Sequence, residues 1–187
     1  MTPRHFLLMI AACVAQLAAI SAQAATVTVD SSSELQYQLS SAPNGSVIEI
    51  VAGTYLAPAG GFLICDPSGG PYCDARRSLV VRAQAGAEVI LSGGSSGIIM
   101  VYKNDAPDGS DSHAIAFEDL TFANGYSASN GKSGGITLDG VNSSFTRVTF
   151  RNNTSEASST GGGALFAYHA GNTVITDSLF DENSAKN

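Results

Sequence analysis

The segment FRNNTSEASSTGGGALF, residues 150–166, decides how this chain folds. One phenylalanine is followed by two asparagines, a run of small polar residues, three glycines and a short apolar stretch. Consecutive glycines are unfavourable in a helix, and asparagines are depleted in strands. The segment therefore suits neither a helix nor a strand along its whole length, and its order requires another explanation.

That explanation is an internal repeat in the C-terminal half of the chain. The related segments TFANG, TFRNN and LFDEN contain Phe122, Phe150 and Phe180, which are spaced by 28 and then 30 residues. Self-similarity at a period of about 20 to 50 residues is typical of stacked structural units. We therefore expect each phenylalanine to begin a corresponding part of one unit.

Two further sequence features repeat at nearly the same spacing as the phenylalanines. Three residues after them stand Gly125, Asn153 and Asn183, and glycine pairs follow at Gly134-Gly135 and Gly162-Gly163. Glycine and asparagine adopt left-handed backbone conformations most readily, so we expect a sharp left-handed bend at the first set of positions. The Ser/Thr run then forms a surface loop, and the glycines let the chain turn into the next strand.

Short strands, Gly/Asn bends and a persistent register predict an all-β parallel solenoid rather than a sandwich, because a sandwich would show hairpin signals. Corresponding residues of successive rungs should lie about 4.8 Å apart. Phe122, Phe150 and Phe180 should then stack inside the coil, where each contributes roughly 1.5–3 kcal/mol.

The first half of the mature chain has its own predicted organisation. Residues 26–46 read as an N-terminal cap, with a strand at 26–30 and a short helix in which Leu35 and Leu39 share one face. Residues 47–112 form the first rungs, with one strand that contains a Gly turn at 47–56, two strands around a Gly bend at 78–94 and another strand at 96–102. Residues 113–187 carry the motif repeats.

Residues 1–24 have the pattern of a secretory signal peptide. Arg4 and His5 precede an apolar run at 6–20, and Ala22 and Ala24 offer a small-residue cleavage site. The mature chain, residues 25–187, then changes its net charge from −7 to −8 because Arg4 is lost. An acidic surface of this kind argues against nucleic acid as a partner.

Export also bears on the cysteines. Cys13 leaves with the signal, whereas Cys65 and Cys73 remain as a pair in an oxidising compartment. A reactive thiol or a metal pair is the alternative, but neither a histidine nor a third cysteine lies nearby in sequence. We therefore predict a structural disulfide between Cys65 and Cys73, in a turn-rich loop.

FRNN and FDEN resemble the F-x-x-N motif, and GGAL at 162–165 the G-G-A-[ILV] motif, of chlamydial-type polymorphic outer membrane proteins. The N-terminal helix followed by GSVIEIVAGTY is similar to the first rung of pectin-lyase-like proteins. The resemblance covers residues 26–187 and implies a right-handed parallel β-helix that is exported. It also implies a surface passenger with a structural or adhesive role, often carrying a C-terminal anchor.

Enzymes also use this fold, so an aligned set of charged residues is a candidate for catalysis. Three residues before each motif phenylalanine stand Asp119, Arg147 and Asp177, which should align as acid, base and acid along one edge. Lyases of the resembled group use carboxylates that hold calcium with an Arg or Lys base, and hydrolases use paired carboxylates. The same alignment equally makes a surface ionic ladder, which is the interpretation we favour.

Asp105, Asp108 and Asp111 are the other candidates, because three carboxylates within seven residues have the oxygen ligands that Ca²⁺ prefers. Their spacing differs from that of an EF-hand loop, so we favour a solvated turn and expect no cofactor.

The sequence thus predicts an exported, non-enzymatic β-helix module in the extracellular space, at the cell surface or outer membrane, or in the periplasm. Surface glycans or cell-surface proteins are its expected partners. The alternative is a polysaccharide lyase or hydrolase of the pectin-lyase-like type, or a fragment of one. The register predicts a next glycine pair near position 192, so we expect the β-helix to be incomplete at its C-terminus. We expect it to be completed by missing rungs or an anchor, or by self-association through the open end.

Overall fold

A computed structural model of the protein describes residues 25–64, 77–95, 97–103, 113–168 and 171–186. The fold of this part is mainly β, with parallel sheets and a single helix. The segment 1–24, the pair Cys65 and Cys73, and the acidic residues Asp105, Asp108 and Asp111 lie outside the described residues.

The described elements follow one another along the chain as β1 (Thr26–Val29), α1 (Ser32–Ser41), β2 (Val47–Ile50), β3 (Gly53–Leu56), β4 (Phe62–Ile64), β5 (Leu79–Ala83), β6 (Val89–Ser92), β7 (Met100–Lys103), β8 (Ala114–Glu118), β9 (Thr121–Ala123), β10 (Tyr126–Ser127), β11 (Ile136–Asp139), β12 (Asn142–Thr146), β13 (Thr149–Arg151), β14 (Thr154–Ser155), β15 (Leu165–Tyr168), β16 (Thr173–Thr176), β17 (Leu179–Asp181) and β18 (Ser184–Ala185). The predicted strand at 26–30 and the predicted helix are both present. The stretch 47–56 forms two strands on either side of a bend rather than one.

The strands form four parallel sheets. The six-stranded sheet has the order β1-β2-β5-β8-β12-β16, and the five-stranded sheet has the order β17-β13-β9-β6-β3. The four-stranded sheet is β15-β11-β7-β4, and the three-stranded sheet is β10-β14-β18. Every described pairing joins strands from successive passes of the chain, so no hairpin occurs among the described strands.

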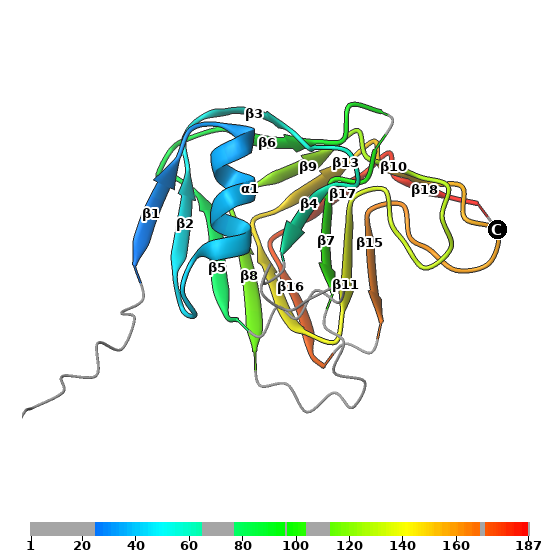
Figure 1. Cartoon of the computed structure of the whole chain (residues 1–187). Coiled ribbons are helices and arrows are strands. Elements are labelled where there is room, and N and C mark those ends of the chain that lie inside the picture. The colour runs from blue at the N-terminus through cyan, green and yellow to red at the C-terminus, as the bar shows by residue number, and fades with distance from the viewer. Residues whose placement is uncertain (1–24, 65–76, 96, 104–112, 169–170, 187) are drawn as a thin grey trace, which may run out of the picture.

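The chain visits these sheets in a constant order. From β8 onward it passes through the six-, five-, three- and four-stranded sheets and then returns to the six-stranded sheet at β12. In Figure 1 the strands β1, β2, β5 and β8 stand side by side, β3, β6 and β9 cross above them, and β7, β11 and β15 form another wall. One complete pass therefore forms one structural repeat.

The phenylalanines align as the repeat predicts. Phe122, Phe150 and Phe180 are direct partners in the register of β9, β13 and β17. The ring centroids are 5.3 Å apart for Phe122–Phe150 and 4.8 Å apart for Phe150–Phe180, both stacked. Phe117 and Phe145 add a second stack at 5.1 Å in the six-stranded sheet.

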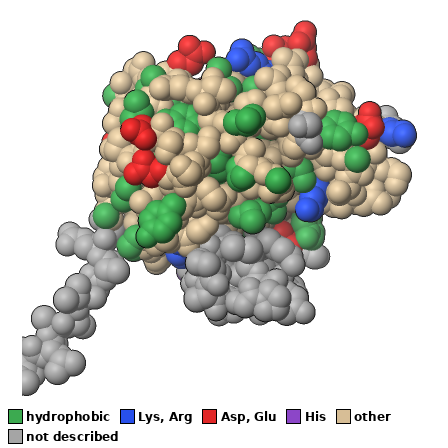
Figure 2. All heavy atoms as spheres, turned by 45° about the horizontal axis from the view of Figure 1, so that its top comes forward, with side chains coloured by type: hydrophobic (Ala, Val, Ile, Leu, Met, Phe, Trp, Pro, Cys, Tyr) green, Lys and Arg blue, Asp and Glu red, His purple; other side chains and the backbone are tan. Residues whose placement is uncertain are grey.

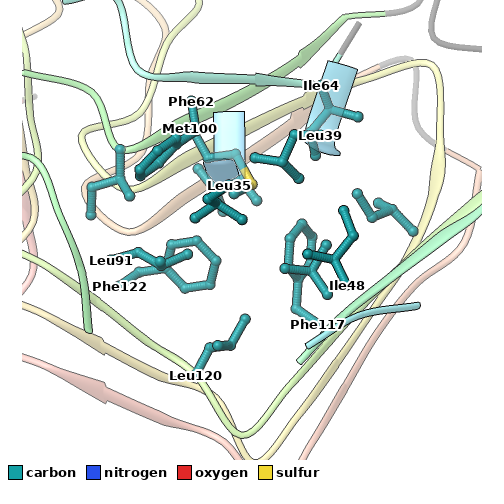
Figure 3. Packing of buried hydrophobic residues seen from close by; sticks show 14 of the residues in the cluster. Leu35, Leu39, Ile48, Phe62, Ile64, Leu91, Met100, Phe117, Leu120 and Phe122 are labelled. Atoms are coloured by element: carbon teal, nitrogen blue, oxygen red, sulfur yellow. The ribbon is translucent and has the colours of Figure 1, made fainter. Parts of the chain in front are cut away.

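The hydrophobic core is filled from α1 and from the six-, five- and four-stranded sheets. Figure 3 shows buried side chains from α1 and from several strands pointing toward one another, among them Leu35, Ile48, Phe62 and Phe117. Leu35 and Leu39 are the buried residues of α1, so the helix contributes its apolar face to the same core. Ser31 caps the helix by accepting a hydrogen bond from the Glu34 N–H.

The expected left-handed bends lie one residue earlier than predicted. Positive φ angles occur at Asn124, Asn152 and Glu182, at 58°, 53° and 50°, and not at Gly125, Asn153 and Asn183. The prediction was wrong because the asparagines at the later position form side-chain hydrogen bonds and do not adopt the left-handed backbone conformation. Asn153 Oδ1 accepts from Gly125 N at 2.9 Å, and its Nδ2 donates to the Phe122 carbonyl at 3.0 Å.

The register of the glycine pairs also differs from the prediction. Ile136 pairs with Leu165, so Gly134 lies over Gly163 and Gly135 over Ala164, and Gly162 precedes the aligned position. The loop before Gly163 therefore holds one more residue than the loop before Gly134. None of these glycines has a positive φ; a Cβ on Gly135 would instead strike the Ala164 carbonyl oxygen, so close backbone approach demands glycine there.

Candidate functional site

A column of charged residues crosses the outer face of the six-stranded sheet. Glu49 on β2 is the register partner of Arg82 on β5, which in turn is the partner of Glu118 on β8. Their neighbours Ile48, Ile50, Val81 and Phe117 are buried, and side chains alternate along a strand. The three charged side chains therefore face away from the core and lie in line across three successive strands.

Arg82 and Glu49 form the ion pair of this column. Arg82 donates from Nε at 3.0 Å and from Nη2 at 2.6 Å, both to Glu49 Oε1. The side chains are 39% and 24% exposed, respectively, so water screens the pair only in part.

A second charged column runs beside the first, at the corner between the six- and five-stranded sheets. Asp119, Arg147 and Asp177 follow β8, β12 and β16 and occupy equivalent corner positions, as the sequence predicts. All three have left-handed φ angles, at 57°, 54° and 50°. Backbone bonds from Asp119 N to Thr146 O and from Arg147 N to Thr176 O hold the corners in line.

Asp119 and Arg147 are bonded through two parallel hydrogen bonds. Arg147 Nε donates to Asp119 Oδ1 at 2.6 Å, and Nη2 donates to Oδ2 at 2.7 Å. These bonds lower the pKa of the Asp119 carboxyl below its ordinary value and raise the pKa of the Arg147 guanidinium. Asp177 contributes to the latter through its charge, as does Glu118.

The two columns meet in a shallow, open depression. It is lined by Glu49, Arg82, Ala83, Ala85, Glu118, Asp119 and Arg147. Three carboxylates and two guanidinium groups thus share one surface. Because the positive and negative groups alternate along both columns, they stabilise one another across rungs.

The hydrogen-bonded pairing of Asp119 with Arg147 limits the reactions that this surface could catalyse. A general acid needs a carboxyl group with a raised pKa, whereas the pKa of Asp119 is lowered. A lyase base must accept a proton, and the pKa of Arg147 is raised further above its ordinary range. Within the described part of the chain, no group of three or more His, Cys, Asp or Glu side chains is arranged to hold a metal ion.

Sequence reasoning identified the corner column and missed the sheet column. The signal for Glu49, Arg82 and Glu118 is a charged residue in an otherwise apolar alternating strand, in VIEI, LVVRA and AIAFE. Their spacings of 33 and 36 residues differ from the motif period, because the loops of the early rungs are longer.

No protein family, curated protein or solved structure matches the chain. Among the described residues, no helix is long and apolar enough to span a membrane. The face shown in Figure 2 carries its charged side chains singly or in small groups among hydrophobic and other uncharged surface.

Proposed function

We propose that the chain is a right-handed parallel β-helix of the pectin-lyase-like kind that acts as an exported, non-enzymatic surface module. The constant order in which the chain visits its sheets supports a β-helix. The right-handed sense follows from the general rule that crossovers between parallel strands of one sheet are right-handed in about 98% of cases. The F-x-x-N and G-G-A-[ILV] resemblance supports the same architecture.

One observation carries the functional part of the proposal. The residues that repeat between rungs bond to their equivalents on neighbouring rungs: Arg147 with Asp119, Phe150 with Phe122 and Asn153 with Asn183. A group that transfers protons needs a pKa suited to that transfer, which the pairing of Asp119 with Arg147 opposes. Because the repeated residues contact one another between rungs, they support a structural or adhesive module.

Export, location and partners belong to the same proposal. The signal-like segment 1–24 supports secretion to the extracellular space, the cell surface or outer membrane, or the periplasm. Surface glycans and cell-surface proteins are the proposed partners, since the faces of stacked strands offer them rows of polar side chains such as Ser143–Thr173 and Thr154–Ser184. The net charge of −7 disfavours nucleic acid as a partner.

The alternative is a polysaccharide lyase or hydrolase, and the depression that gathers Glu49, Arg82, Glu118, Asp119 and Arg147 favours it. The full chain, exported to a periplasm and shown to be β-rich by circular dichroism, is incubated with polyuronates and neutral glycans, with and without Ca²⁺. We expect no new unsaturated or reducing ends, and binding of whole glycans or cells at most.

Cleavage that disappears in Arg147→Gln would overturn the non-enzymatic proposal. The matched control is Arg151→Gln, an exposed arginine in the neighbouring strand β13 that lies outside the depression. Cleavage that survives in both variants equally and separates from the protein on gel filtration belongs to a contaminating enzyme, whereas cleavage that co-elutes with the protein would also overturn the proposal.

A further inference from the structure

We propose that the open depression beside the six-stranded sheet binds a neutral glycan through a pair of adjacent hydroxyl groups, which builds on the non-enzymatic role proposed above. The charged residues of the depression lie on β2, β5 and β8 or directly after β8 and β12. Each of these strands is paired on both sides within the six-stranded sheet. The site therefore lies inside the stack of rungs, and its ligand class follows from the hydrogen-bonding groups that it presents.

Glu118 is the central carboxylate of the depression. Its strand β8 lies between β5 and β12, so Arg82 is its register partner on one side, and Arg147 directly follows its register partner on the other. Both arginines are bonded to other carboxylates, those of Glu49 and Asp119 respectively. Glu118 is half-buried and forms no hydrogen bond or ion pair with a described residue, although its charge acts on Arg147.

Each neighbouring arginine also keeps unused donors. Arg82 bonds Glu49 through Nε and Nη2. Arg147 bonds Asp119 through the same two nitrogens. A guanidinium group has N–H donors on all three nitrogens, so Nη1 of each arginine has no acceptor among the described residues. The depression thus presents carboxylate oxygens that lack a donor beside guanidinium nitrogens that lack an acceptor.

Only a group that both donates and accepts can satisfy both kinds of atom. A ligand carboxylate would accept from the guanidinium groups but would be repelled by Glu118, in a depression that holds three carboxylates and two guanidinium groups. A ligand ammonium would donate to Glu118 but would be repelled by Arg82 and Arg147. A hydroxyl group donates once and accepts twice, so it can lie between Glu118 and an arginine and bond both.

The arrangement favours two adjacent hydroxyl groups over a single amide. The backbones of Arg82 and Arg147 are two strand spacings apart, roughly 9–10 Å, with Glu118 between them. Two hydroxyl groups can each bridge one carboxylate oxygen and one guanidinium group, whereas a side-chain amide has one acceptor oxygen and serves one arginine. Sugar rings carry adjacent hydroxyl groups, and Ala85, exposed in the depression, offers an apolar contact to the C–H face of a ring.

Isothermal titration calorimetry of the full chain, exported to a periplasm, tests the ligand class with neutral oligosaccharides of glucose, galactose and mannose. The charged probes are galacturonate and glucosamine oligosaccharides of the same length. We expect saturable binding of at least one neutral oligosaccharide, with both charged probes about tenfold weaker or more, equivalent to about 1.4 kcal/mol. Periodate, which cleaves the bond between carbons that carry adjacent hydroxyl groups, should abolish binding of the neutral oligosaccharide.

Glu118→Gln tests the site, because glutamine replaces one carboxylate oxygen by a donor and removes the negative charge. Binding of the neutral oligosaccharide should weaken about tenfold or more, while binding of the galacturonate probe should strengthen. Damage to the fold would weaken both. The control is Glu88→Gln, an exposed glutamate outside the depression, which should leave both affinities unchanged. Glu118 has no ion pair with a described residue to lose, so the variant should fold, which circular dichroism verifies.

Three results would overturn this proposal and leave the non-enzymatic role in place. The first is a lack of saturable binding by every neutral oligosaccharide, or equal binding of a charged probe. The second is neutral binding that Glu118→Gln leaves unchanged, which would place the ligand elsewhere. The third is tighter binding of a peptide rich in asparagine and glutamine, which would assign the depression to a protein partner. Shortened oligosaccharides recovered after the titration would instead overturn the non-enzymatic role itself.

Discussion

Asn153 is fully buried, and both ends of its side-chain amide are bonded to neighbouring rungs. Its Oδ1 accepts from Gly125 N, and its Nδ2 donates both to the Phe122 carbonyl and to Asn183 Oδ1. Buried backbone groups that lose their partner cost free energy, because no water replaces it. Asn153 therefore ties three rungs together at the corner.

Replacement of Asn153 by alanine should lower the free energy of unfolding by about 1–3 kcal/mol, since it leaves the buried Gly125 N–H without its acceptor and removes a donor to the Phe122 carbonyl. Urea denaturation followed by circular dichroism measures this loss. The control is Asn152→Gly, an exposed neighbour with a φ of 53° that glycine adopts freely, expected to change stability by no more than about 0.5 kcal/mol. Equal stability of the two variants would show that the ladder is dispensable.

The ion pair of Asp119 and Arg147 makes a pH-dependent contribution to the stability of the folded state. The pKa of Asp119 is lowered in the folded state by its hydrogen bonds with Arg147. The stability from this pair is therefore complete above the ordinary aspartate pKa of about 4 and is lost as pH falls through the lower folded-state value. The side chains are 43% and 54% exposed, so the effect is small.

We expect Asp119→Asn to flatten the acid limb of the stability profile measured by urea denaturation between neutral pH and the acid transition. In an Arg147→Gln background the same substitution should leave the shape of that limb unchanged, because the cause of the lowered pKa is already absent. An identical flattening in both backgrounds would mean that another group, and not Arg147, sets the titration of Asp119.

For individual residues, the sequence predicts some roles correctly and assigns others to the wrong position. The alignment of Asp119, Arg147 and Asp177 follows from counting back from each motif phenylalanine. The left-handed residues at Asn124, Asn152 and Glu182 do not follow, because backbone propensity cannot tell which of two adjacent asparagines bends and which bonds. Side-chain hydrogen bonds across rungs decide that, and they involve residues about 28 to 31 positions apart.

The elements of the coil are held together by stacks of equivalent residues. β9, β13 and β17 place their phenylalanines directly over one another, and Phe150 also meets Phe145 edge-on at a centroid distance of 5.5 Å. Phe150 is fully buried between two rings, whereas Phe180 is 45% exposed. Equivalent positions in the repeat thus differ in environment according to their place along the coil.

Phe150→Ala should cost about 3–5 kcal/mol of unfolding free energy, because it removes a buried ring from between two others. Phe180→Ala should cost less than half as much, since its ring already contacts water on one side. Chemical denaturation of both variants provides the comparison. Equal losses would contradict the stacking order, and a larger loss at Phe180 would mean that its exposed face is covered in solution.

Whether an element could be predicted depends on how local its signal is. Short periodic patterns in the local sequence predict the helix at 32–41 and the strand at 26–29, and both are present. The register of the glycine pairs was missed by one residue, because the extra residue lies in a polar loop before Gly163 where insertions leave no pattern. The sheet column of Glu49, Arg82 and Glu118 was missed because the early rungs are longer than the motif period.

Over the whole molecule, the two ends of the coil are unequal. α1 covers the first rung with Leu35 and Leu39, and Gln36 bonds the edge of β4. The last rung is supported from one side alone, and Figure 1 shows β18 at the far end of the chain from α1. In a stacked repeat each unit is stabilised mainly by its neighbours, so within residues 25–186 stability should decrease toward β16–β18, which pair on one side among the described strands.

Native-state hydrogen exchange tests this gradient with matched amides. The N–H groups of Leu179 and Ser184, bonded to Val148 and Asn153 carbonyls, should exchange about tenfold faster or more than those of Thr149 and Thr154 one rung earlier, which bond to Leu120 and Gly125 carbonyls. Local opening of the last rung breaks one interface, whereas opening of the inner rung breaks two. Uniform exchange of all four amides would instead mean that the rungs unfold as one cooperative unit, and the open edge would then be as stable as the interior.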